Sequence, residues 1–334
     1  MNQPRSTVLL CALMVAAAFT ICHADDVTPP AEPELRAVIT KGMGYLARGS
    51  YEWMAQKNWK PCHHMTKVLW HNREARMRGF TIDEGKFNEW LRWSDENKTD
   101  IKAGREMTAL MKLAMPDKPQ PELTKIILEG QKPDGSWMPS GQFLGQKRVK
   151  TESAANSTRI FLLALAAGDA DPKVRDEAMA KAAAFLAKDG ASTSVETLAY
   201  RALFARRLGK PEEVAAILGE IVKLQHADGG WGWQIKEPAS DSIATGLALY
   251  SLQPAADPAT TAAISRAQRW LMANQKEDGG WPVDYSKISS TDRSKPEKAK
   301  SLKDATMIYS YWGAAWSTLG LLQGVPAKQG APAE

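Results

Sequence analysis

Three stretches of the sequence decide the fold: residues 131–137 (QKPDGSW), 225–231 (QHADGGW) and 275–281 (QKEDGGW). Each has a glutamine, an Asp-Gly pair three residues later and a tryptophan after one more residue. An Asp-Gly pair after an apolar run ends a helix, because glycine accepts a left-handed backbone and aspartate bonds within its own turn. The tryptophan adds a large apolar group, and the glutamine amide bonds backbone groups. We therefore expect structural roles for Gln131, Asp134, Trp137, Gln225, Asp228, Trp231, Gln275, Asp278 and Trp281.

The spacing of these motifs indicates a longer repeat. They lie 94 and 50 residues apart, and a degenerate copy at residues 186–190 (LAKDG) divides the longer interval. Proline is favoured in the first turn of a helix, and apolar-periodic runs begin at Pro33, Pro121, Pro172, Pro211 and Pro258. A capping box at residues 81–84 supplies a sixth start. Intervals of about 40 to 50 residues are typical of two-helix repeats.

A second helix is expected after each start. These helices are predicted at residues 62–78, 103–115, 153–167, 193–208, 242–252 and 305–323. Their apolar residues cover most of the circumference, as in residues 160–165 (IFLLAL), which is typical of buried helices. The first helices, such as residues 258–274, are more amphipathic. The sequence thus predicts an all-α protein with about six helical hairpins, arranged as an α/α toroid with an inner and an outer ring.

The repeats resemble those of the squalene-hopene cyclase and protein prenyltransferase β-subunit superfamily, whose members are α/α toroids with a central cavity. The resemblance covers most of residues 25–323, for which we expect a single toroid domain. Fold alone does not fix function, so each site of that superfamily has to be sought among these residues.

Composition narrows the function classes. The 334 residues are 44% hydrophobic and 24% charged with a net charge of +5, which fits a globular protein and gives no basis for nucleic-acid binding. Residues 1–24 are typical of a secretory signal peptide, and their 14-residue apolar run is too short for a stable membrane anchor. We expect export to the periplasm or the extracellular space, and a disordered tail at residues 324–334.

The acid that a cyclase needs is missing. The resemblance implies a D-x-D-D-T-A motif that protonates an alkene, and the nearest segment, residues 238–245 (PASDSIAT), keeps a single aspartate, Asp241. Asp241 is the weak catalytic candidate, and an N-cap is the expected role for an aspartate just before a helix. The sequence therefore predicts a toroid without cyclase chemistry.

Cys62, His63 and His64 form the candidate cofactor site. They resemble the C-x-x-C-H-H haem attachment segment of exported bacterial toroid proteins, in which His63 would be the axial ligand. Trp59 replaces the first cysteine, so the cofactor stays unknown and covalent haem is disfavoured. No metal site is expected, because the prenyltransferase zinc ligands have no counterpart.

Aromatic residues on the inner helices are candidates for lining a central cavity, namely Trp70, Tyr309, Tyr311, Trp312 and Trp316. Two long segments, residues 138–150 and 283–303, are expected as loops on one rim, with basic residues that include Arg148. The predicted function is binding of an apolar or planar small molecule. The alternatives are a terpenoid cyclase, a polysaccharide-lyase-type enzyme with a cationic subsite on these loops, and the degenerate haem protein.

Overall fold

The computed structural model describes residues 28–56, 63–97, 106–116, 118–139, 148–167, 169–253, 257–283 and 294–328. The predicted signal peptide, Cys62, Trp59 and the last six residues lie outside these ranges. His63 is the first residue of a helix, but its side chain is not described.

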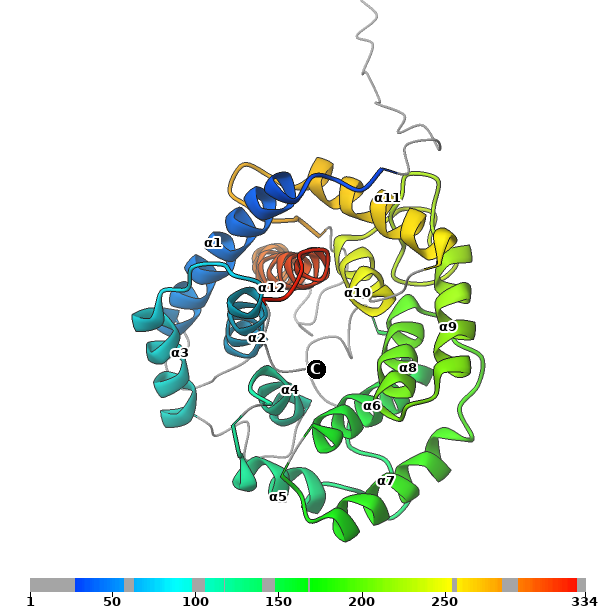
Figure 1. Cartoon of the computed structure of the whole chain (residues 1–334). Helices are drawn as coiled ribbons and strands as arrows, with labels where there is room; N and C mark the ends of the chain where they lie inside the picture. The colour runs from blue at the N-terminus through cyan, green and yellow to red at the C-terminus, as the bar shows by residue number, and fades with distance from the viewer. Residues whose placement is uncertain are drawn as a thin grey trace, which may run out of the picture.

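The described residues form two concentric rings of helices, with helices alternating between the rings along the chain (Figure 1). The outer ring contains α1 (Glu32–Gln56), α3 (Glu84–Glu96), α5 (Pro121–Glu129), α7 (Pro172–Leu186), α9 (Pro211–Lys223) and α11 (Pro258–Asn274). The inner ring contains α2 (His63–Met77), α4 (Glu106–Ala114), α6 (Ser153–Ala166), α8 (Val195–Arg207), α10 (Ser242–Leu252) and α12 (Lys295–Leu322). A short 3-10 helix, η1 (Lys150–Glu152), precedes α6. The predicted α/α toroid of six hairpins is confirmed.

Local sequence signals explain where the outer helices begin. α5, α7, α9 and α11 begin at the predicted prolines. Asp171 accepts the backbone N–H groups of Lys173 and Val174, and Asp257 accepts that of Thr260, so both are N-caps.

The C-terminal region departs from the prediction in two ways. α12 begins at Lys295 rather than near residue 305, because Pro296 in the first turn and the helix-favouring Lys, Glu and Ala residues after it extend the helix through the expected loop. Residues 324–328, expected in a disordered tail, pack on the toroid. Val325 is buried, and the Lys328 N–H donates to the Met77 carbonyl at 2.8 Å.

The repeat tryptophans hold each turn to its own outer helix. Their indole N–H groups donate to carbonyl oxygens ten residues earlier, at 2.7–2.8 Å. Trp137, Trp231 and Trp281 are all at most 1% exposed. Each buried indole therefore has its hydrogen bond satisfied while it fills the space under the turn.

The repeat glutamines connect each turn to the next outer helix. Gln131 Nε2 donates to Ala178 of α7 at 2.8 Å, and Gln225 Nε2 donates to Ala263 of α11 at 2.8 Å. Gln275 Nε2 donates to Val38 of α1 at 2.9 Å. Because α1 is the first helix and Gln275 ends the last outer helix, the third copy of the motif closes the ring.

The glycine of each motif lies directly against that next helix. Gly279 has φ of +90°, and a Cβ there would lie 2.2 Å from the backbone oxygen of Lys41 on α1. Gly135 has the same φ and would meet the oxygen of Lys181 on α7 at 2.2 Å. Only glycine fits a left-handed turn at such close approach.

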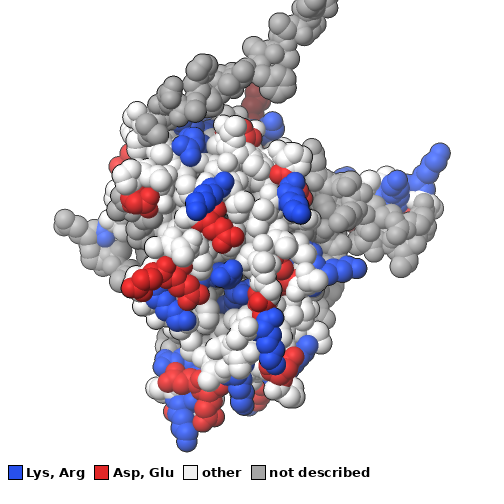
Figure 2. Space-filling model, turned by 90° about the vertical axis from the view of Figure 1, so that its right-hand side faces the viewer, with Lys and Arg blue, Asp and Glu red and all other residues white. Residues whose placement is uncertain are grey.

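Charged residues on the outer face that includes α9 are mixed in sign, with no large area of one charge (Figure 2). The described helices include none that is long and apolar enough to cross a membrane.

Candidate functional site

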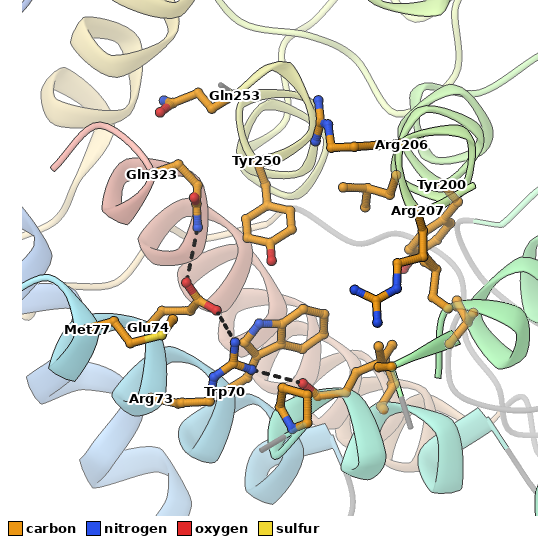
Figure 3. Close-up of a pocket in the computed structure, with 17 residues that line it drawn as sticks. Trp70, Arg73, Glu74, Met77, Tyr200, Arg206, Arg207, Tyr250, Gln253 and Gln323 are labelled. Atoms are coloured by element: carbon orange, nitrogen blue, oxygen red, sulfur yellow. Dashed lines mark hydrogen bonds and ion pairs between the residues drawn. The ribbon is translucent and has the colours of Figure 1, made fainter. Parts of the chain in front are cut away.

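A pocket of about 510 Å³ lies on the axis of the toroid, where the C-terminal ends of the inner helices converge (Figure 3). We call it the axial pocket. Its apolar lining consists of Trp70, Met77, Leu110, Leu113, Pro116, Ile160, Leu163, Ala167, Leu203 and the rings of Tyr200 and Tyr250. Its polar lining consists of Arg73, Glu74, Arg206, Arg207, Gln253 and Gln323.

Aromatic rings form one wall of the axial pocket. Trp70 of α2 and Tyr250 of α10 meet edge to face with ring centroids 6.0 Å apart. Trp316 of α12 packs behind both, at 5.8 Å from Trp70 and 5.9 Å from Tyr250. The three interlocked rings hold the buried Trp70 and the half-buried Tyr250 in fixed positions along the pocket wall, which suits a flat ligand.

Arginines at the mouth bond to the ends of neighbouring inner helices. Arg207 Nη2 donates to the Ala166 carbonyl of α6 at 2.6 Å, and Arg206 Nη2 donates to the Ser251 carbonyl of α10 at 2.8 Å. Arg73 Nη1 reaches Leu113 O of α4 at 3.4 Å. Cations are stabilised at helix C-termini, so the converging helix ends explain why arginines gather here.

The mouth carries a positive excess. Among the described residues, one carboxylate lines the pocket, that of Glu74. It pairs with Arg73 at 3.2 Å and with Arg78 at 2.6 Å. The three lining arginines against this one glutamate give a net charge of +2. An anionic group would be attracted to this mouth.

Deeper along the axis, at the N-terminal ends of α4 and α8, lie buried ionic groups. Arg148 Nη1 donates to Glu106 at 2.8 Å, and its Nε donates to both Glu196 oxygens at 3.0 Å. Ser157 Oγ donates to Glu106 at 2.7 Å, and Asn156 Nδ2 to Glu196 at 3.3 Å. All three charged side chains are at most 2% exposed. Together with Lys67 we call them the axial charge cluster.

Arg148 corrects one expectation directly. It was expected on a basic rim loop, but it inserts into the core because two carboxylates there bind both sides of its guanidinium. Burial acts to lower the pKa of Arg148, but Glu106 and Glu196 raise that pKa well above its ordinary value. Burial raises the pKa of Glu196, opposed by Arg148.

Lys67 of α2 is fully buried beside the axial pocket. Its Nζ lies 3.5, 4.5 and 5.1 Å from the ring centroids of Trp316, Trp70 and Trp312. No described residue accepts a hydrogen bond from Nζ. Burial lowers the pKa of Lys67 well below its ordinary value, although Glu106 opposes the shift. Such a lysine is unusual, since buried lysines are nearly always paired.

His71, one turn further along α2, is held neutral. Its Nδ1 lies 2.8 Å from Lys67 O, and its Nε2 lies 3.1 Å from the Asn72 amide nitrogen. Because that nitrogen is a donor, Nε2 accepts and Nδ1 carries the proton. Burial lowers the pKa of His71 from about 6.5 to about 4.

We expect acid to destabilise the protein through His71. Between pH 6.5 and pH 4 the unfolded chain binds a proton at His71 that the folded chain does not bind. Lowering the pH across this range therefore reduces the free energy of unfolding by about 3 kcal/mol. Urea unfolding at several pH values measures it. The His71→Gln variant, which cannot be protonated, should lose that part of the pH dependence, and identical pH profiles would contradict the assignment.

His64, whose side chain is described, is the member of the predicted cofactor site that can be placed, and it lies away from the axial pocket. His64 is stacked on Trp53 with centroids 4.5 Å apart and contacts the ring of Tyr311 at 3.8 Å. These three residues line a separate pocket of about 270 Å³ between α1, α2 and α12. Cys62 and the His63 side chain lie outside the described residues, so the cofactor site at residues 62–64 stays a prediction.

The predicted cavity residues divide among different places. Trp70 lines the axial pocket, Trp312 and Trp316 surround Lys67, and Tyr311 donates to the His64 carbonyl at 2.9 Å. Tyr309 is fully buried.

Asp241 accepts the N–H groups of Ile243 and Ala244 as the N-cap of α10, at the opposite end of that helix from the axial pocket. No cluster of three or more potential metal-ligating side chains was found within the described ranges.

Sequence reasoning missed the polar groups of the axis: Lys67, Arg73, Glu74, Glu106, Glu196, Arg206 and Arg207. Some of these residues could have been predicted, because they are charged residues on helices that the repeat pattern assigns to the buried inner ring. Charged residues are seldom buried without a partner.

No protein-family model and no curated protein sequence matches the chain. Solved structures do match. The type II terpene cyclase MstE from Scytonema has a TM-score of 0.57 at 12% identity, covering 89% of this chain and 99% of the cyclase. The chain has the α/α-toroid fold.

Two carbohydrate-related structures share that toroid. A polysaccharide lyase has a TM-score of 0.54 at 11% identity, covering 87% of this chain and 97% of the lyase. A possible GH105 family member from Salmonella enterica has a TM-score of 0.51 at 13% identity, covering 89% of this chain and 94% of that chain. Identities this low establish the architecture and leave the site to be argued from its own residues.

Proposed function

We propose that the protein binds a small acidic molecule with a flat apolar body in the axial pocket. The observation that carries the proposal is the combination, in one pocket, of a fixed aromatic wall and a mouth with more guanidinium than carboxylate. The volume of about 510 Å³ lies within the range of about 300–1,000 Å³ typical of ligand sites. The flat body would lie against Trp70 and Tyr250, and the acidic group would face Arg206 and Arg207.

Cyclase chemistry is not part of this proposal. Protonating an alkene takes a neutral acid in the cavity, whereas the carboxylate that lines the pocket, Glu74, is ion-paired with two arginines. Asp241 caps a helix at the far end from the pocket. The lyase-type alternative stays compatible with the shared toroid fold and with the arginines of the axial pocket. The haem alternative depends on Cys62, which lies outside the described residues.

We also propose that the protein acts outside the cytoplasm, in the periplasm or the extracellular space. The signal-peptide pattern of residues 1–24 supports this location.

Binding is tested with 2-naphthoate, a flat acid, and with naphthalene-2-carboxamide, its neutral analogue. Titration calorimetry should show saturable binding of 2-naphthoate and weaker binding of the amide. Arg207→Gln should weaken 2-naphthoate binding at least about tenfold, since a hydrogen bond to a charged group contributes roughly 1.5–3 kcal/mol.

The matched control is Arg175→Gln, which removes a half-buried arginine of outer helix α7, far from the pocket lining, and should leave the affinity unchanged. No saturable binding of either compound, or equal affinity for both, would rule out the proposed acid-binding role.

A further inference from the structure

The pocket of about 270 Å³ that His64 lines is a second candidate binding site, and we call it the rim pocket. It lies between α1, the start of α2, α12 and the third repeat turn, which contributes Asp278. The axial pocket instead lies at the C-terminal ends of the inner helices and shares no lining residue with it. The two pockets can therefore bind different ligands independently.

Aromatic rings line the rim pocket. His64 lies nearly parallel to Trp53, with an interplanar angle of 12°, and the Tyr311 ring contacts its other neighbour side at 3.8 Å between centroids. Tyr45 of α1 supplies a further ring of the lining. A Cβ at Gly49 would lie 2.8 Å from the Tyr311 ring, so the glycine lets that ring pack directly against α1. The lining thus offers several aromatic groups within one small volume.

Carboxylates outnumber guanidinium groups in the same lining. Glu52 of α1 and Asp278 are exposed carboxylates, and Arg48 is the guanidinium that lines the pocket among the described residues. Arg48 Nη2 donates to the backbone carbonyl of Asp278 at 2.5 Å. Burial raises the pKa of Tyr45, and Asp278 and Glu52 raise it further against the opposing effect of Arg48. The field at the Tyr45 phenol is therefore negative.

We propose that the rim pocket binds a small organic cation that carries a methyl-substituted ammonium group. Aromatic faces attract such a cation and also contact its methyl groups, and the carboxylates raise its local concentration. A bare metal ion would need several converging oxygen ligands, and no such cluster was found in the described parts of the chain. This site goes beyond the proposed function, because its ligand has the opposite charge to the acid proposed for the axial pocket.

The test compares choline with 3,3-dimethyl-1-butanol, which has the same shape but a carbon atom in place of the charged nitrogen. Titration calorimetry should show saturable binding of choline. The neutral alcohol should bind at least about tenfold more weakly, because the cation–π attraction acts on the charge and is strongest in a desolvated site.

Two pairs of variants locate the binding. Tyr45→Leu removes a ring and should weaken choline binding at least about threefold, whereas Tyr45→Phe keeps the ring and should bind choline nearly as the wild type does. Glu52→Gln, at an exposed position that folding does not depend on, should weaken choline binding about two- to fivefold. Its control is Glu32→Gln, which removes the same charge from the far end of α1 and should have no effect.

Three results would overturn the proposal: no saturable binding of choline, equal affinity for choline and the neutral alcohol, or choline binding that both Tyr45→Leu and Glu52→Gln leave unchanged. The outcome is separable from that of the acid-binding role. Choline binding should be unchanged in Arg207→Gln and in the presence of saturating 2-naphthoate, so either site can fail its test while the other passes.

Discussion

The Arg148→Met variant should be less stable than the wild-type protein by about 3–5 kcal/mol at pH 7, because it leaves two buried carboxylates without their cation. Arg148 is 1% exposed and bonds to both Glu106 and Glu196. Methionine fills much of the same volume as arginine, so the lost stability measures the missing positive charge rather than the creation of a large cavity. Guanidinium chloride unfolding followed by tryptophan fluorescence measures it.

The control for Arg148→Met is Lys150→Met, two residues further along at an exposed position, which should change stability by less than about 0.5 kcal/mol. A triple variant that also carries Glu106→Gln and Glu196→Gln should recover much of the lost stability, since removing every charge avoids the unpaired state. If the triple variant is as unstable as Arg148→Met, packing rather than charge explains the effect.

The Gly279→Ala variant should lose more than about 4 kcal/mol, because its Cβ has no room and its backbone conformation disfavours any side chain. The new Cβ would lie 2.2 Å from the Lys41 oxygen, and that oxygen belongs to the backbone of α1, which cannot rotate away. The hydrogen bond from Gln275 to Val38 would be strained in the same movement. The melting temperature and the unfolding free energy both measure the loss.

Gly190→Ala supplies the matched control. Gly190 also follows an aspartate, in the degenerate copy of the repeat, but a Cβ there meets nothing within 4 Å and its φ is not positive. Its substitution should be neutral or slightly stabilising. Equal stability of the two variants would mean that the ring does not close through the Gly279 turn.

Much of the fold could be predicted because the signals are local. A proline, an aspartate cap and an Asp-Gly stop each act within a few residues, and together they place α7 and α11 at their observed starts. The start of α12 was missed because its first turns are highly charged and lie outside the apolar stretch that marked the helix.

The site was less predictable because its contacts are distant in sequence. Nothing near Arg148 shows that carboxylates 42 and 48 residues away will bind it. The tryptophans around Lys67 come from α2 and α12, at opposite ends of the chain. The sequence predicts that aromatic residues on the inner helices line a cavity. It does not predict which rings face the pocket, because that depends on how each inner helix is rotated about its axis.

The position of α12 has a consequence for biosynthesis. This helix packs between α10 and α2 and also contacts α1, so the two earliest helices gain their final neighbour only when the last one has been made. Until then the growing polypeptide is an incomplete arc with apolar flanks facing solvent, a condition that favours aggregation and chaperone capture. Maturation therefore depends on residues 295–322 emerging intact, and a product terminated before them would be an open crescent without an enclosed centre.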